Sequence, residues 1–436
     1  MRTARPPRFD QLRLCVNARL RRRSAFLASL ALLATLVSLL AACSLPFGDA
    51  SSAPTPLPTA TATPRPPTPE EIAAQMVSKM SLEDKLGQMI IIQFYETTYT
   101  PAQQQMVKPF HPGGVILYGY SMGTAQQVKG LLAGGQKDSP IPMFTFLDLE
   151  GGYVDRLAQY LGPRMSAPQM AASGDPAVAQ REGAKTAKDL LSFGFNADLA
   201  PDVDVAIVNG PDQYGRTFGK TPDVVTKYAG SWIDGLQASG VVGAPKHFPG
   251  LGAATIDAHK GLPVVNRTKE QLEATEFGPY NALIASGQMQ MVMSTDVLMP
   301  ALDPKLPAEL SKPIITGVLR DELGFKGVAI TDALYMDGIS ATYTFTQAAV
   351  LAFEAGNDMI MVPWRPSMVQ SIITAMKTEL QKGKITQEQI DASVTRILAL
   401  KIRYHLLPGA SGSTTPTVTP NGTRTPSAEL PRQQAA

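Results

Sequence analysis

Cysteine and histidine are both scarce in this 436-residue sequence. The only cysteines are Cys15 and Cys43, and Cys15 lies in a segment that we expect to be removed, so the mature protein cannot form an internal disulfide. Its stability must therefore come from a hydrophobic core. None of the four histidines belongs to a His-Glu-x-x-His arrangement, which gives little support for a zinc site. We expect neither a metal ion nor a cofactor.

A strong excess of one charge is also missing, because the chain has 39 Lys and Arg against 37 Asp and Glu. The first 42 residues contain eight arginines and one acid, which leaves 31 basic and 36 acidic residues from position 43 onward. Binding to nucleic acid requires a basic surface that neutralises phosphates. The mildly acidic mature chain therefore argues against nucleic acid as a partner.

The N-terminus has the order of a bacterial export signal. Arg19 and the three arginines at 21–23 precede an uncharged apolar run at 25–42, and the sequence at 40–43 is LAAC. This ending resembles the lipobox of bacterial lipoproteins, so we predict a signal peptide at 1–42 and a membrane anchor through a lipid on Cys43. The alternative is an uncleaved membrane-spanning helix, since about 18 apolar residues can cross a bilayer. Either interpretation places the rest of the protein outside the cytoplasmic membrane.

Both ends of the remaining chain are rich in proline, threonine, alanine and serine. Residues 43–69 include PTP and PRPP, and residues 408–436 include TTPT. Such segments bury too little apolar surface to fold, so we interpret the first as a tether and the second as a low-complexity, disordered tail. The folded domain is expected at 70–407, a length typical of one α/β barrel.

Within 70–407, short apolar runs alternate with amphipathic segments such as 179–193, 223–239, 269–286 and 345–355. This alternation predicts βα units on a parallel sheet. The expected strands are 89–94, 114–117, 143–147, 196–199, 242–245, 289–294, 327–330 and 358–362. Eight such units favour a closed (β/α)₈ barrel, while an open doubly wound sheet is the alternative.

Polar residues follow four of these strands, where the loops of a barrel converge on one face. They are Asp148 after the third strand, Asp202 after the fourth, Lys246 and His247 after the fifth, and Asp332 after the seventh. Each alone has a structural explanation, because aspartate caps helices, histidine can be buried in a core and lysine is commonly a surface charge. Their shared position at one end of four strands instead favours a functional site.

The loop after the fifth strand, KHFPGLGAATIDAHKGLP at 246–263, places Asp257 two residues before His259. A carboxylate beside an imidazole fixes its tautomer, which allows the ring to donate and accept a proton near neutral pH. Gly250 and Gly252 also suggest a dinucleotide-binding loop. That interpretation has little support, because the third glycine and the paired downstream acid are missing.

This loop resembles the signature of glycoside hydrolase family 3, in particular of its β-N-acetylglucosaminidase branch. Four further motifs match the family in the same order. They are DLEGG at 148–152 with Arg156, GRTFG at 215–219, LRDELGFKG at 319–327 and ITDALYM at 330–336. The resemblance covers nearly all of 70–407 and implies a single (β/α)₈ barrel.

The resemblance implies retaining hydrolysis in two displacements. Asp332 matches the nucleophile that forms a glycosyl ester, and His259, oriented by Asp257, matches the acid/base that protonates the leaving oxygen and then activates water. A histidine thus replaces the second carboxylic acid of most retaining glycosidases. The positions that match the family's binding site for the terminal sugar are Asp148, Arg156, Arg216, Lys246 and His247.

Three departures from the family pattern bear on the substrate. Leu251 stands where a histidine is usual, Tyr153 stands where an arginine is usual, and STDV at 294–297 replaces a histidine-containing strand end. Only 29 residues follow position 407, so the second αβα domain of the family's β-glucosidases is not expected. With the Asp257 and His259 pair, this favours the N-acetylglucosaminidase branch.

The sequence therefore predicts an exo-acting β-N-acetylhexosaminidase that removes terminal β-linked N-acetylglucosamine from cell-wall or chitin-type glycans. Three alternatives remain. The protein could be a β-glucosidase-type or other family 3 glycosidase, a phosphorylase in which phosphate replaces water, or a lipoprotein that binds sugar without catalysis.

Overall fold

The computed structural model describes residues 65–210 and 215–407. The predicted signal peptide, Cys43, the tether up to residue 64 and the tail at 408–436 lie outside these residues. Among the helices that are described, none is both long enough and apolar enough to cross a membrane.

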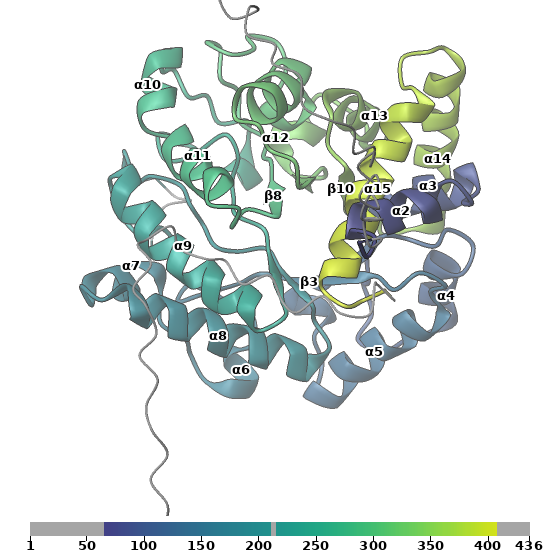
Figure 1. Cartoon of the computed structure of the whole chain (residues 1–436), viewed down its shortest axis with the longest axis horizontal. Helices are drawn as coiled ribbons and strands as arrows, with labels where there is room; N and C mark the ends of the chain where they lie inside the picture. Colours follow the sequence, from purple (N-terminus) through teal and green to yellow (C-terminus); the bar gives the residue numbers. More distant parts are fainter. Residues whose placement is uncertain (1–64, 211–214, 408–436) are drawn as a thin grey trace, which may run out of the picture. The chain divides into compact units, whose positions relative to one another are not determined.

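Eight parallel strands form the centre of the domain, with helices around them (Figure 1). They are β1 (Ile90–Gln93), β2 (Gly114–Ile116), β3 (Phe144–Leu147), β6 (Ala197–Asp198), β7 (Val242–Gly243), β8 (Met291–Met293), β9 (Val328–Ala333) and β10 (Met359–Met361). Each coincides with one of the strands expected from the sequence.

The strand order is β7-β6-β3-β2-β1-β10-β9-β8. The two outer strands meet just beyond β7, where Phe248 N donates to Met293 O at 2.8 Å and Met293 N donates to Pro245 O at 3.0 Å. The sheet is therefore a nearly closed barrel, which confirms the expected fold and rules out the open doubly wound sheet. The helices bury the outer face of the strands, and Ile90, Ile91 and Ile92 are all fully buried.

The helices precede β1, occupy the connections between strands and follow β10. The α-helices are α2 (Pro69–Val77), α3 (Leu82–Gln88), α4 (Pro101–Val107), α5 (Ala125–Asp138), α6 (Ala158–Leu161), α7 (Ala167–Ala172), α8 (Pro176–Phe193), α9 (Pro222–Ala238), α10 (Lys269–Ala274), α11 (Phe277–Ala285), α12 (Asp337–Ser340), α13 (Phe345–Ala355), α14 (Pro366–Gln381) and α15 (Gln387–Arg403). Three 3₁₀ turns, η1 (Gly119–Ser121), η2 (Ala258–Lys260) and η3 (Ala308–Leu310), and a π-helix, η4 (Pro313–Glu322), complete the described helices.

Local sequence sets the ends of these helices. The Asp175 side chain accepts from Ala177 N at the start of α8, and Gly194 ends this helix in the left-handed region with φ of 93°. The amphipathic segment at 269–286 forms two helices, α10 and α11. Proline at position 279 has no N–H, and in a continuous helix its ring would clash with the carbonyl four residues earlier, at Thr275, which is the C-cap of α10.

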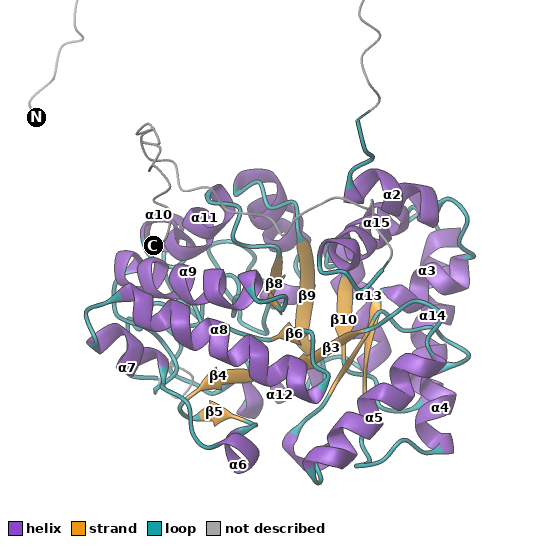
Figure 2. Cartoon of the chain, turned by 60° about the horizontal axis from the view of Figure 1, so that its bottom comes forward, coloured by secondary structure: helices purple, strands orange, loops and turns teal. Residues whose placement is uncertain are grey.

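A short antiparallel hairpin follows β3 before the chain enters its next helices. It consists of β4 (Leu149–Gly151) and β5 (Val154–Asp155), and Figure 2 shows it apart from the barrel strands and near α6. Asp148 therefore precedes a strand and does not cap a helix. Asp332 lies inside β9 and does not follow that strand, because β9 continues three residues beyond the predicted end at 330.

Candidate active site

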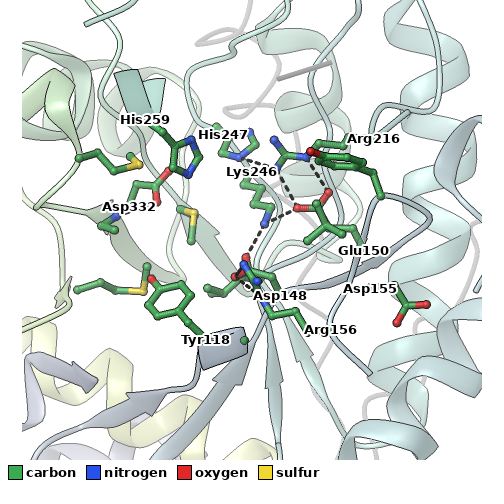
Figure 3. A pocket seen from close by; sticks show the side chains of 18 of the residues that line it. Tyr118, Asp148, Glu150, Asp155, Arg156, Arg216, Lys246, His247, His259 and Asp332 are labelled. Atoms are coloured by element: carbon green, nitrogen blue, oxygen red, sulfur yellow. Dashed lines mark hydrogen bonds and ion pairs between the residues drawn. The ribbon is translucent and has the colours of Figure 1, made fainter. Parts of the chain in front are cut away.

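A cavity of about 740 Å³ opens at the carboxyl ends of the barrel strands. All eight candidate residues in the described chain line it, and Figure 3 shows most of them pointing into the same space. The cavity therefore brings together candidate residues separated by up to 184 positions, from Asp148 to Asp332. These lining residues are Asp148, Arg156, Arg216, Lys246, His247, Asp257, His259 and Asp332.

Lys246 is the centre of a buried ion-pair network on one side of the cavity (Figure 3). Its Nζ lies 2.9 Å from Asp148 Oδ1 and 2.6 Å from Glu150 Oε1. Arg156 binds the other oxygen of Asp148, at 3.1 Å, and Arg216 donates to both oxygens of Glu150 at 2.9 Å. Each of the two carboxylates thus pairs with two cations, which fixes the orientation of the whole group.

The network keeps its members charged despite their burial. Burial by itself would raise the pKa of Asp148, but the charges of Lys246 and Arg156 outweigh it and hold that pKa well below its ordinary value. Lys246 and Arg216 lower the pKa of Glu150 in the same way. Burial would lower the pKa of Lys246, yet the two carboxylates raise it. The cavity wall is therefore a rigid set of hydrogen-bond donors and acceptors that fits a polyhydroxylated ligand.

His247 extends this network towards a second pair of acids. Its Nδ1 lies 2.7 Å from Asp204 Oδ2, and its Nε2 lies 3.3 Å from an Arg216 nitrogen. Burial opposes the charged imidazole, but the hydrogen bond and charge of Asp204 raise the pKa of His247. Asp202 lies next to this pair, and burial together with the charge of Asp204 raises its pKa to about 8.

Asp202, Asp204 and His247 bring potential ligand atoms within 4.8 Å of one another. Both oxygens of Asp204 already accept hydrogen bonds, from His247 and from Leu251 N at 2.7 Å. Arg216 lies 3.8 Å from Asp202 Oδ2, where its positive charge opposes the approach of a cation. We therefore interpret the group as acids that orient His247 and Arg216.

The proposed acid/base pair lies on the exposed loop that contains η2. His259 Nδ1 is 2.9 Å from Asp257 Oδ1, and the same oxygen accepts from His259 N at 3.0 Å. Burial would raise the pKa of Asp257, but these hydrogen bonds and one with Lys260 lower it. The ionised carboxylate favours the tautomer of His259 that carries a proton on Nδ1, an arrangement that suits proton exchange at Nε2.

Asp332 is held at the end of β9 by neighbours from three segments. Its Oδ2 accepts from Thr295 Oγ1 at 3.2 Å, and its Oδ1 accepts from Ala333 N at 2.7 Å. Its own backbone N–H donates to Glu309 Oε2 at 2.9 Å. These contacts leave a carboxylate with a fixed direction at the wall of the cavity, as a nucleophile requires.

Glu309 is fully buried and lies close to two other acids, Asp296 and Asp332. Burial and the charges of these neighbours raise the pKa of Glu309 well above its ordinary value, which favours its neutral form. Asp296 belongs to the STDV segment that departs from the family pattern, and it is also fully buried. Glu309 and Asp296 lie next to Asp332 and outside the surface that lines the cavity.

The other two departures from the family pattern, Leu251 and Tyr153, differ in burial. The Leu251 side chain is buried in the core beneath the network, and it does not line the cavity. Tyr153 is 81% exposed on the hairpin between β4 and β5 and forms part of the cavity mouth. Of the two, only Tyr153 is placed to contact a bound ligand.

Several functional residues were not identified from the sequence. Glu150 belongs to the DLEGG motif and follows Asp148 by two positions, a spacing that could have indicated its role. Asp204 and Glu309 have no comparable local signal, because their partners lie 43 and 23 positions away.

Comparison with known proteins agrees with this geometry. Residues 81–400 match the model of the glycosyl hydrolase family 3 N-terminal domain. The chain is 31% identical to beta-hexosaminidase A of Pseudoalteromonas piscicida over 345 residues, which cover 73% of this chain and 57% of that protein. It is 29% identical to beta-hexosaminidase LpqI of Mycobacterium tuberculosis over 392 residues, which cover 86% of this chain and 98% of that protein.

A solved structure of a family 3 beta-N-acetylglucosaminidase from a Paenibacillus species superimposes with a TM-score of 0.71 at 34% identity. The match covers 78% of this chain and 65% of that one. The chain thus spans somewhat less than two thirds of these two longer relatives and nearly all of LpqI. The family model covers most of the chain, and the candidate site residues line one cavity of the barrel. The chain belongs to glycosyl hydrolase family 3.

Proposed function

We propose that the protein is an exo-acting, retaining β-N-acetylhexosaminidase that releases terminal β-linked N-acetylglucosamine from cell-wall or chitin-type glycans. The observation that carries the proposal is the position of Asp332 and His259 on the same cavity as the buried Lys246 network. Relatives named beta-hexosaminidase, with 31% and 29% identity, support this choice of sugar.

In the first proposed step, the Asp332 carboxylate attacks the anomeric carbon of the terminal sugar. The bond to the leaving oxygen breaks, and His259 gives that oxygen a proton. In the second step, neutral His259 takes a proton from water, which attacks the same carbon and releases Asp332 and the free sugar. Asp257 carries no proton in either step, because its part is to orient the imidazole and stabilise the charged form.

The Lys246 network accounts for the proposed recognition of a chain end. Its paired carboxylates and cations offer acceptors and donors to sugar hydroxyls and to the N-acetyl group without any further loss of side-chain freedom. The same buried network forms one wall of the cavity, which leaves little space for a sugar chain to continue on that side.

The test is a paired assay on the full-length protein with an aryl β-N-acetylglucosaminide and the matching β-glucoside. We expect release from the N-acetylglucosaminide, and release from the glucoside alone would reject the proposal. Asp332→Ala and His259→Ala should each lower kcat by about 10²–10⁴-fold. Sugar 1-phosphate formed in phosphate buffer would identify a phosphorylase instead, and binding of N-acetylglucosamine oligomers without turnover would identify a sugar-binding protein.

We also propose that the protein is exported and anchored to the outer side of the cytoplasmic membrane through a lipid on Cys43. The support is the arginine-rich segment followed by an apolar run that ends at this residue. Mass spectrometry of the membrane-extracted N-terminus should find a lipid-modified Cys43, and Cys43→Ser should release the protein from membranes. An unmodified N-terminus that retains residues 1–42 would contradict the proposal.

A further inference from the structure

The cavity and its surroundings carry charged and aromatic side chains mostly on different sides. Apart from Asp332 in β9, the charged side chains that line the cavity come from segments that follow β3, β6 and β7, which are neighbours in the barrel. Apart from Tyr153, which follows β3, exposed or half-buried aromatic side chains at this end of the barrel follow β1, β2, β9 and β10, which are neighbours on the opposite side. These aromatic residues are Tyr95, Tyr118, Tyr120, Tyr335 and Trp364.

On the aromatic side, the rings form a continuous row from the cavity to the surface. Tyr118 lines the cavity, and its ring centre lies 5.9 Å from that of Tyr120. The ring of Tyr120 lies in turn 4.9 Å from that of Tyr95. Tyr120 is 53% exposed and Tyr95 is 62% exposed, so the row leads outward into solvent.

Tyr335 connects the row to the residues of β9 and β10. It lines the cavity and packs edge to face against Trp364, with ring centres 5.9 Å apart. Burial and, to a smaller extent, the electrostatic effect of Tyr335 raise the pKa of Tyr120 to about 12. Tyr118 and Tyr335 thus bring both groups of rings to the same cavity, and neighbouring exposed apolar groups of this kind commonly mark a binding surface.

The position of the acid/base shows which part of a substrate meets these rings. The turn η2, which contains His259, packs against α12, and α12 begins two residues after Tyr335. His259 must reach the leaving oxygen, so the leaving group departs on the side of β9 and β10. The Lys246 network lies on the other side of the cavity and holds the terminal sugar.

We propose that Tyr120 and Tyr95 form a binding platform for the second leaving-group sugar of a β-1,4-linked N-acetylglucosamine oligomer, beyond a first one that meets Tyr118 and Tyr335. The chemistry is the contact between the apolar face of a neutral pyranose ring and an aromatic ring, with the tyrosine hydroxyls available to sugar hydroxyls. This inference rests on the proposed function and specifies its substrate as a neutral oligosaccharide of three or more sugars.

The test compares kcat/KM for an aryl β-N-acetylglucosaminide with those for the β-1,4-linked N-acetylglucosamine disaccharide, trisaccharide and tetrasaccharide. The full-length wild type should cleave the trisaccharide about tenfold more efficiently than the disaccharide. Tyr95→Ala combined with Tyr120→Ala should lower the ratio of kcat/KM for the trisaccharide to kcat/KM for the aryl glycoside by about tenfold. Each ring contact of this kind is worth roughly two- to tenfold in binding. Tyr95→Phe keeps the ring and should keep the ratio.

Leu191→Ala is the matched control, because Leu191 is an exposed apolar residue on α8, outside the cavity. It should leave the ratio unchanged. A double variant with the wild-type ratio and an unchanged melting temperature would overturn the platform, and so would a wild type that cleaves the disaccharide and trisaccharide equally well.

Calorimetry separates the failure of the platform from failure of the proposed function. Asp332→Ala protein should bind the tetrasaccharide about tenfold more tightly than the same protein with Tyr95→Ala and Tyr120→Ala. If the wild type does not hydrolyse N-acetylglucosaminides, the proposed function fails, and this comparison still tests the platform. Equal affinities would refute the platform even in an active enzyme.

Discussion

Replacing Lys246 with methionine tests whether the buried ion-pair network stabilises the barrel. Methionine keeps most of the volume of the side chain but removes the ammonium group between Asp148 and Glu150, 2.9 and 2.6 Å away. Removing one partner of a buried ion pair typically destabilises a protein by about 3–5 kcal/mol, because the other charge stays buried. Each carboxylate here retains an arginine, so we expect a loss of about 3 kcal/mol at pH 7.

The loss should depend on pH in a defined direction. In the wild type the pKa values of Asp148 and Glu150 are lowered on folding, so their contribution to stability is complete above their unfolded values. It is lost as the pH falls through the folded values. In Lys246→Met the arginines alone oppose burial, so both carboxyls protonate more readily. The difference in stability between the two proteins should therefore shrink as the pH falls from about 5 towards 3.

Urea unfolding followed by circular dichroism, at pH 7 and at pH 4, measures this difference. The control is Lys185→Met, because Lys185 is half exposed and forms only a surface ion pair with Asp189 at 3.2 Å. That change should cost less than about 1 kcal/mol at either pH. A loss below about 1 kcal/mol for Lys246→Met, or a loss of equal size at both pH values, would refute the assignment of the network as a stabilising unit.

Three further predictions concern other buried positions. The pKa of Asp202 is raised to about 8 in the folded protein, so the unfolded chain binds fewer protons than the folded one between pH 4 and 8. The free energy of unfolding should therefore fall by up to about 1.4 kcal/mol per pH unit as the pH rises from 4 to 8. Asp202→Asn should flatten this slope in urea titrations, and an unchanged slope would contradict it. Glu309→Ala leaves the Asp332 N–H unpaired and should lower kcat about tenfold or more. Glu309→Gln keeps an acceptor for this N–H, so its kcat should stay within a few-fold of the wild-type value. Steady-state kinetics on an aryl glycoside measures both effects. Gly183→Ala should destabilise the protein by about 1–3 kcal/mol in thermal or urea unfolding, because the added Cβ atom would lie 2.1 Å from a carbonyl oxygen of α9. An unchanged free energy of unfolding would mean that α8 and α9 can separate at little cost.

The barrel could be predicted because its strands are short, apolar and buried on both faces. Runs such as 89–94 and 143–147 stand out from the helical segments around them, and their number and alternation permit few folds. The limits of individual elements were less predictable. Asp332 lies within β9 because pairing with β10, which reaches Ala333, extends that strand, an effect that the residues of β9 alone do not encode.

The sequence by itself indicated the approximate positions of the eight strands, because these depend on residue type and local spacing. Its resemblance to the family then pointed to the eight candidate residues that line the cavity. Only the tertiary structure decided which distant groups meet. The contact of Lys246 with Asp148 across 98 positions and the contact of Glu309 with Asp332 both depend on the convergence of strand ends on one face of the barrel. Strands such as β3 and β7 are distant in sequence, and the protonation of the side chains that follow them depends on burial and on charges that only the nearly closed barrel brings together.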